Sequence, residues 1–174
     1  MMELVVGAGE KKQILLVHDK AETAQQVIRL AGEGAEVQVD EIFMAGAQSN
    51  VTIIHDALRT VSRVNTRGIV GKGKHVLSHA KVIIPKHAQL SDSFVSQHFL
   101  LLDESAQAEA LPSLEIEADE VKASHAATIS PLDEEKLFYL TSRGLSTNEA
   151  RKLIIEGFLK LPKEYESLLE KWQA

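Results

Sequence analysis

Short apolar segments recur through roughly the first 130 residues at intervals of about 8–12 residues, a spacing typical of all-β proteins. Single glycines or small polar pairs separate them, and the Asn-Gly and Asp-Gly pairs of tight hairpins are absent. Apolar and polar residues often alternate, as where Leu114, Ile116 and Ala118 are separated by acidic residues. This pattern predicts many short strands, each with one buried face.

Three all-β architectures fit this spacing: a sandwich, a barrel and a β-solenoid. Short turns and Ala- and Ser-containing strands favour the solenoid, because stacked coils accommodate small inward side chains. Aromatic residues make up 5% of the 174-residue chain and hydrophobic residues 44%, so the core has to be aliphatic. No strict hexapeptide repeat is present, which disfavours the left-handed helix of acyltransferases. The residues alone leave all three architectures open.

After Pro131 the hydrophobic period changes to that of an α-helix. Asp133 and the acidic residues after it are typical of a helix N-terminus, where they complement the helix dipole. We expect this helix to end at Gly144, since glycine adopts the left-handed backbone that follows many helices. The sequence therefore predicts a β-rich body over residues 1–130 and a helical segment over residues 131–174.

A capping box formed by Ser146 and Glu149 marks the start of a second helix, which Pro162 ends. Residues 163–173 (KEYESLLEKWQ) predict a third, short amphipathic helix, with Tyr165, Leu168, Leu169 and Trp172 as its apolar residues. The apolar residues of the second helix recur at helical spacing: Leu153, Ile154, Gly157, Phe158 and Leu161.

Composition excludes several classes of function. The net charge of −6 argues against nucleic acid or an anionic membrane as the principal partner. No apolar run approaches the roughly 18–20 residues of a membrane span, and the N-terminus does not resemble a signal peptide. Cysteine is absent, which excludes disulfides and thiolate ligands. We expect a soluble, cytoplasmic protein.

The histidines contain one pair at a spacing used by metal ligands. His75 and His79 are four residues apart, which places two ligands on one face of a helix. The residues around them are typical of a strand, in which these positions lie about 13 Å apart. We interpret this pair and four further histidines as solvated strand or loop residues: His18, His55, His87 and His98.

Two charged segments invite functional interpretations. Residues 71–74 (GKGK) lack the GxxxxGK[ST] frame of a phosphate loop, and no helix follows, so we interpret them as a solvated turn. Glu115, Glu117, Asp119 and Glu120 form an acidic edge. We interpret it as a strand face that discourages edge-to-edge pairing.

Three segments carry a resemblance to a known family: residues 114–128 (LEIEADEVKASHAAT), 137–146 (LFYLTSRGLS) and 149–159 (EARKLIIEGFL). They resemble the C-terminal signature of the SufB/SufD family, the scaffold proteins of an iron–sulfur cluster assembly machine. The resemblance is most specific from Phe99 onward and extends more loosely to the N-terminus. It implies a mainly β protein, with a right-handed parallel β-helix followed by a small helical segment.

The resemblance assigns one site residue of the body. His125, in the segment SHAAT, matches the histidine of the family's SHGAT-like motif, with Ala126 in place of glycine. It implies a metal or cluster contact shared at a dimer interface. The alternative, a hydrogen-bonded histidine at a chain corner between strand and helix, remains open. The resemblance implies no catalytic residue and no resident cofactor, with iron or an iron–sulfur cluster held only transiently.

The resemblance also implies partners. Its helical segment docks a SufC-like ABC ATPase, which would supply the ATP chemistry because this chain has no Walker motif. Arg143 and Gly144 match the family's turn, and we expect Leu153, Ile154 and Phe158 to contribute to the docking surface. The β-helix would pair near its last strands with a SufB-like subunit or with itself.

Two departures from the family matter. Catalytic scaffold members carry a cysteine before the LLL strand, whereas the chain has none around Gln97 and His98. The chain is therefore SufD-like in this respect. Relatives also carry an N-terminal part ahead of this segment, so we expect a short form or a fragment.

Three function classes follow. The favoured one is a non-enzymatic scaffold subunit that dimerises and docks an ATPase. The second is a stand-alone β-helical dimerisation module without metal chemistry. The third, a carbohydrate-active β-helix enzyme, requires acidic and basic residues stacked on one face, and the candidates are Asp40, Asp56, Arg59 and Arg63.

Overall fold

The computed structural model describes residues 2–165, which form ten strands, two α-helices and a short 3₁₀ turn. The strands are β1 (Met2–Val6), β2 (Lys11–His18), β3 (Thr23–Leu30), β4 (Glu36–Phe43), β5 (Gln48–His55), β6 (Val61–Val70), β7 (His75–Ile84), β8 (Asp92–Leu101), β9 (Gln107–Ile116) and β10 (Lys122–Pro131). The helices are α1 (Glu134–Ser142) and α2 (Thr147–Leu159), and the 3₁₀ turn is η1 (Lys163–Tyr165).

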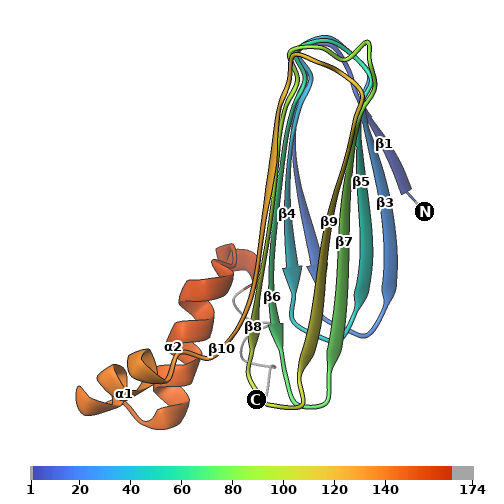
Figure 1. The fold of residues 1–174 in the computed structure, drawn as a ribbon. Coiled ribbons are helices and arrows are strands. Elements are labelled where there is room, and N and C mark those ends of the chain that lie inside the picture. Colours follow the sequence, from blue (N-terminus) through green and yellow to red (C-terminus); the bar gives the residue numbers. More distant parts are fainter. Residues whose placement is uncertain (1, 166–174) are drawn as a thin grey trace.

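The strands alternate between two parallel five-stranded sheets. Odd-numbered strands form one sheet in the order β1-β3-β5-β7-β9, which we call sheet A, and even-numbered strands form sheet B in the order β10-β8-β6-β4-β2. Each coil of the chain thus adds one strand to each sheet (Figure 1). The predicted parallel β-solenoid is confirmed, and the sandwich and barrel alternatives are wrong.

The unequal length of the coils explains why no repeat is visible in the sequence. Lys11 pairs with Glu36 and Glu36 with Val61, so the first two steps between equivalent positions of sheet B are equal. The next steps, from Val61 to Asp92 and from Asp92 to Lys122, are longer. Because strands and turns lengthen along the stack, equivalent positions do not recur at one period.

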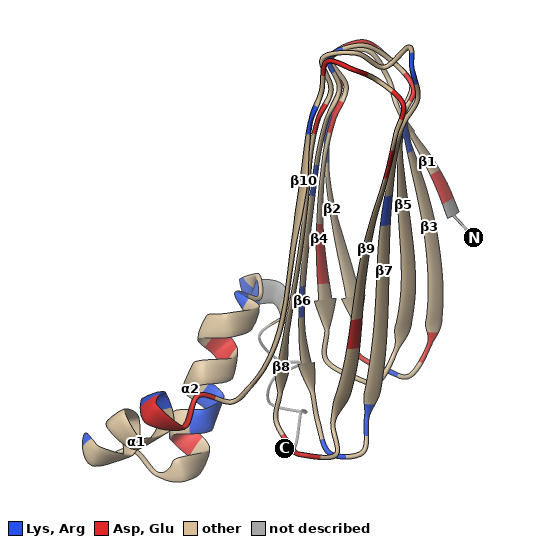
Figure 2. Ribbon diagram, viewed as in Figure 1, with Lys and Arg blue, Asp and Glu red and all other residues tan. Residues whose placement is uncertain are grey.

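The interior between the sheets is aliphatic, as the composition predicts. Inward positions stack in register from coil to coil, for example Val39, Val64 and Val95, none of which is exposed. Charged residues concentrate at the turns at the two ends of the strands (Figure 2). Burial of in-register aliphatic side chains is therefore the main stabilising contribution to the body.

One inward column combines aromatic rings with a glycine. His18, Phe43, Gly68 and Phe99 are in register on four successive strands of sheet B. The rings of His18 and Phe43 lie 4.5 Å apart, and those of Phe43 and Phe99 5.6 Å apart. A Cβ at Gly68 would lie 2.5 Å from the Phe99 ring, so only glycine lets the two phenylalanines meet across this strand.

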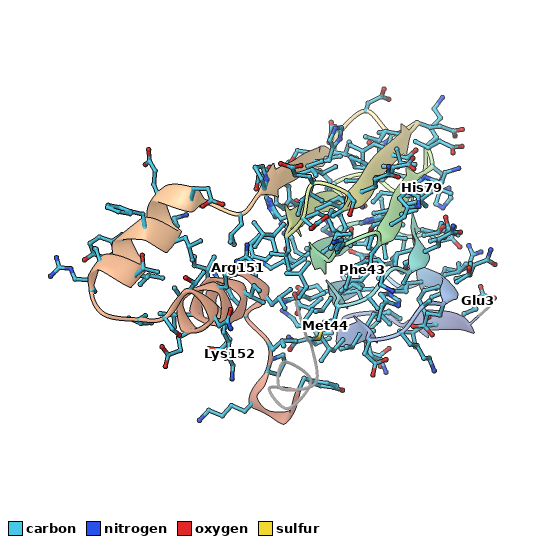
Figure 3. The ribbon with its side chains drawn as sticks, turned by 90° about the horizontal axis from the view of Figure 1, so that it is seen from below. Glu3, Phe43, Met44, His79, Arg151 and Lys152 are labelled. Carbon is cyan, nitrogen blue, oxygen red and sulfur yellow. The ribbon has the colours of Figure 1, made fainter. Side chains whose placement is uncertain are left out.

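The helical hairpin of α1 and α2 lies along the outer face of sheet B (Figure 1). The buried residues of α2, Ala150, Ile155 and Leu159, belong to one apolar cluster with Ile42 and Met44 of the body. Phe43, between these two, faces the interior (Figure 3). Burial is continuous at the end of β4 because both faces of the sheet are covered there.

The ends of both helices agree with the predictions. Asp133 accepts a hydrogen bond from the Lys136 backbone N–H and caps α1, and Gly144 follows with φ = 100°. Ser146 and Glu149 form the predicted capping box. Of the third predicted helix, residues 163–173, the structure describes only Lys163–Tyr165, which form the turn η1, and the rest lies outside the described residues.

The predicted position of His125 at a corner between strand and helix is wrong. Residues Lys122–Pro131 form the full strand β10, in parallel register with β8. Its small side chains do not alternate clearly between apolar and polar, so the sequence does not indicate a strand here. Backbone hydrogen bonds to β8 define it instead.

Candidate functional site at the terminal coil and the helical hairpin

Among the described residues, the terminal coil ends the stack with two unpaired strand edges, β9 in sheet A and β10 in sheet B. The flanking backbone bonds show that even-numbered residues of β10 donate to β8, as Lys122 does to Ser91 O. The N–H groups of its odd-numbered residues therefore face the free edge. In β9 the odd-numbered residues bond to β7, so the missing N–H of Pro112 falls on the free edge.

The two edges therefore differ in how well they can accept another strand. Pro112 interrupts the donors of β9 near its centre, whereas the only proline of β10 is its last residue, Pro131. Between Lys122 and Pro131 the strand carries neither a lysine or acidic side chain nor a bulge to protect it. The edge of β10 is thus an unprotected row of backbone donors and acceptors.

His125 lies on this strand. It is in register with Val95, so its side chain belongs to an inward column, yet it is exposed because no further coil covers it. Within residues 2–165, no group of three or more His, Asp or Glu side chains is arranged to hold a metal ion. Any metal at His125 would therefore need ligands from outside these residues.

Of the six other histidines, His98 is half-buried on β8, and the remaining five divide into two groups. His75 and His87 bond to acidic residues at the surface, Glu109 at 2.9 Å and Asp56 at 3.1 Å, and His79 lies on the outer side of sheet A (Figure 3). The prediction that His18 and His55 are solvated is wrong: both are buried. The sequence does not predict this burial, because the hydrogen-bond partners of the two histidines lie in other coils or across a turn.

His18 lies between two carboxylates, the buried one of Glu41 and the partly exposed one of Glu22. Its Nδ1 lies 3.0 Å from Glu22 Oε1 and its Nε2 3.1 Å from Oε1 of the buried Glu41. Burial lowers the pKa of the imidazole, but the hydrogen bonds and charges of Glu41 and Glu22 outweigh burial and raise it overall. The protonated form of His18 is thereby favoured.

His55 lies among hydroxyl groups instead. Its ring nitrogens lie 2.7 Å from Thr60 Oγ1 and 2.9 Å from Ser62 Oγ, which in turn contact Ser91 and Ser93 at 2.8 Å. Burial lowers the pKa of His55 to about 4. This histidine is neutral and completes a hydroxyl ladder along the coils.

The hairpin exposes a second surface. Phe138 is 74% exposed and Tyr139 56% exposed, and the Arg143 guanidinium lies 5.2 Å from the centre of the Tyr139 ring. Leu153 is 48% exposed, whereas Ile154 and Phe158 pack partly against the apolar cluster beneath α2. Sequence reasoning missed Phe138 and Tyr139, although they are large aromatic residues that flank the buried Leu137 without sharing its helical face.

The candidates for carbohydrate chemistry do not form one cluster. Asp40 accepts hydrogen bonds from neighbouring amides on the outer face of sheet B, beside a groove of about 540 Å³ that α2 also lines. Asp56 and Arg59 belong to the turn after β5, and Arg63 pairs with Asp92. Their separate ion pairs give no support to a shared glycosidic site.

None of the helices within the described residues is long and apolar enough to cross a membrane. The fold and its two exposed surfaces define a parallel β-solenoid with an appended helical hairpin. Comparison with known proteins supplies the family. The chain belongs to the SufBD family, because residues 10–158 match the SufBD core domain of SUF system FeS cluster assembly.

Relatives agree with this assignment. The chain is 32% identical over 145 residues to iron–sulfur cluster assembly SufBD family proteins of Staphylococcus aureus and Staphylococcus haemolyticus. The match covers 78% of this chain and 31% of each relative. The chain thus spans about a third of the length of these relatives, and the resemblance seen in its motifs is confirmed.

Proposed function

We propose that this chain is a non-catalytic scaffold component of iron–sulfur cluster assembly that acts in the cytoplasm. Its family is one of iron–sulfur cluster assembly proteins. The observation that carries the proposal is the unprotected edge of β10 with an exposed histidine on it. This arrangement offers a partner backbone hydrogen bonds and one imidazole ligand at the same place.

Pairing takes place through β10. A strand from a SufB-like subunit, or β10 of a second copy, extends sheet B by main-chain hydrogen bonding. Pro112 makes the neighbouring β9 edge the poorer acceptor. His125 then lies next to the junction and contributes one ligand to iron or a cluster, which is the cargo, while the partner contributes the others.

The edge can be blocked without disturbing the fold. Because odd-numbered N–H groups of β10 face outward, Ala127→Pro removes a free-edge donor and leaves the bonds to β8 intact. We expect this variant to keep its circular dichroism spectrum and lose association, measured by sedimentation velocity with the SufB-like subunit and alone. Ala127→Ser is the matched control. Undiminished association of the proline variant would overturn the proposal.

The hairpin docks the SufC-like ATPase. Phe138, Tyr139 and Leu153 offer apolar area, and Arg143 and Gly144 shape the turn between the helices. Ile154 and Phe158 mainly hold α2 on sheet B, so they support this surface from below. The rigid stack would transmit movement of the docked ATPase to the β10 edge.

Co-purification tests the docking surface. We expect Phe138→Ala combined with Leu153→Ala to reduce recovery of the ATPase at least about tenfold, since exposed apolar anchors dominate such interfaces. Lys152→Ala, an exposed change on the same helix, is the control. Equal recovery with the double variant would refute docking at this surface.

The stand-alone dimerisation module is the second candidate, because β10 could pair without holding metal. Iron binding by wild type and His125→Ala, each with the partner present, separates the two. Loss of bound iron in the variant with unchanged pairing supports the scaffold. Unchanged pairing with no iron bound by either protein supports the module.

A further inference from the structure

A layer of buried polar side chains crosses the otherwise aliphatic interior. Glu41, Thr66 and Gln97 are in register on sheet B, and Ser49 and Ser78 are in register on sheet A. All five are at most 1% exposed. The layer separates two apolar clusters of the interior, one containing Val39, Val64 and Val95 and the other Phe43 and Phe99.

Hydrogen bonds link this layer along the axis of the stack. Starting from the partly exposed Glu22, the chain of contacts passes through His18 to Glu41. Glu41 Oε2 accepts from Thr66 Oγ1 at 3.0 Å and from Ser78 Oγ at 3.4 Å. Ser78 in turn accepts from Gln97 Nε2 at its Oγ, at 2.8 Å, and at its backbone O, at 2.9 Å.

The linkage stops at Gln97. Its Oε1 is buried and has no hydrogen-bond partner among the described residues. The hydroxyl groups of Thr66 and Ser78 in the same layer both donate to Glu41 and are not available. A buried amide oxygen without a donor costs about 1–3 kcal/mol, so a donor from outside the protein would be strongly favoured.

The terminal coil places no polar side chain in register with the end of this chain of hydrogen bonds. The residue in register with Gln97 on β10 is Ala127, and the one in register with Ser78 on β9 is Ala110. Neither side chain carries a polar group, and Ala127 is exposed. The polar layer is therefore covered toward the open end only by methyl groups, close to His125 on the same strand.

We propose that the open end of the solenoid holds an ordered water molecule that donates to Gln97 Oε1. This water extends the hydrogen-bond chain, so that its two ends reach solvent at Glu22 and beside His125. The site belongs to the terminal coil of this chain and needs no partner. It goes beyond the scaffold function and does not rest on it.

Two substitutions of Ala127 test the site, because it is the nearest residue on the open side. In Ala127→Ser the hydroxyl takes the place of the water, and in Ala127→Val a methyl pair fills the space without a donor. We expect a crystal structure of the wild type to show water within hydrogen-bond distance of Gln97 Oε1, and both variants to lack it.

Stability supplies the second readout. We expect the unfolding equilibrium constant of Ala127→Ser to match wild type within about threefold, and that of Ala127→Val to rise about tenfold, since Oε1 is then left without a donor. Absence of water at Gln97 Oε1 in the wild-type crystal structure would overturn the proposal, and a marked stabilisation by Ala127→Ser would show independently that the site is dry. Association through β10 is measured separately and does not bear on this result.

Discussion

At the scale of single residues, His18 ties the first coil to the second through its two carboxylate partners. Burial lowers the pKa of His18, but the hydrogen bonds to Glu41 and Glu22 raise it overall, above its ordinary value of 6.5. A histidine with a raised folded pKa stabilises fully below 6.5 and loses this contribution as the pH rises through the folded value. We therefore expect the free energy of unfolding, measured by urea denaturation, to fall above pH 6.5. His18→Gln should lack this fall; a fall of equal size in the variant would contradict the assignment.

His55 limits the stability of the protein at acidic pH, whereas His18 limits it at higher pH. Burial lowers its pKa from 6.5 to about 4, so the unfolded chain binds a proton in this range that the folded protein does not. Its contribution is complete above pH 6.5 and is lost as the pH falls toward 4, by on the order of 3 kcal/mol at most. Urea denaturation across this range should show the loss. In His55→Gln, whose amide can still bond to Thr60 and Ser62, the free energy of unfolding should depend less steeply on pH. An identical dependence would show that His55 does not cause the loss.

At the scale of elements, local signals were sufficient for the helices and insufficient for the strand β10. Asp133, Ser146 and Glu149 cap helices through contacts with near neighbours in the chain, so their effect is visible in sequence. The strand β10 depends on hydrogen bonds to β8, one full coil earlier, and its small residues carry no periodic signal. The buried partners of His18 and His55 were hidden because they too lie in other coils or across a turn.

The helix α2 has an inner and an outer face that can be distinguished by mutation. Ile155 is 2% exposed and packs in the cluster on sheet B, whereas Leu153, on the same helix, is 48% exposed. We expect Ile155→Ala to lower the free energy of unfolding by about 2–4 kcal/mol, through lost burial and the cavity left behind. Leu153→Ala is the control and should cost under about 1 kcal/mol. Equal losses in chemical denaturation would mean that α2 does not pack on this face.

At the scale of the whole molecule, the fold is a one-dimensional stack in which each strand is held by its neighbours in the same sheet. Within residues 2–165, strands β3 to β8 each have a neighbour on both sides, whereas β1, β2, β9 and β10 each have one. In such stacks stability is close to a sum of coil contributions and nearest-neighbour contributions. Opening should therefore begin at the ends, and the interior coils should open last.

Amide hydrogen exchange tests this arrangement and links it to function. We expect exchange in β4 to β7 to be at least about tenfold slower than in β2 and β10, because the inner strands open only after an outer coil has separated. A partner strand gives β10 a second neighbour, so adding the SufB-like subunit should slow exchange in β10 and leave β2 unchanged. Uniform exchange across all strands of the free protein would contradict the stack. Slowing of β2 instead of β10 would place the pairing edge at the opposite end.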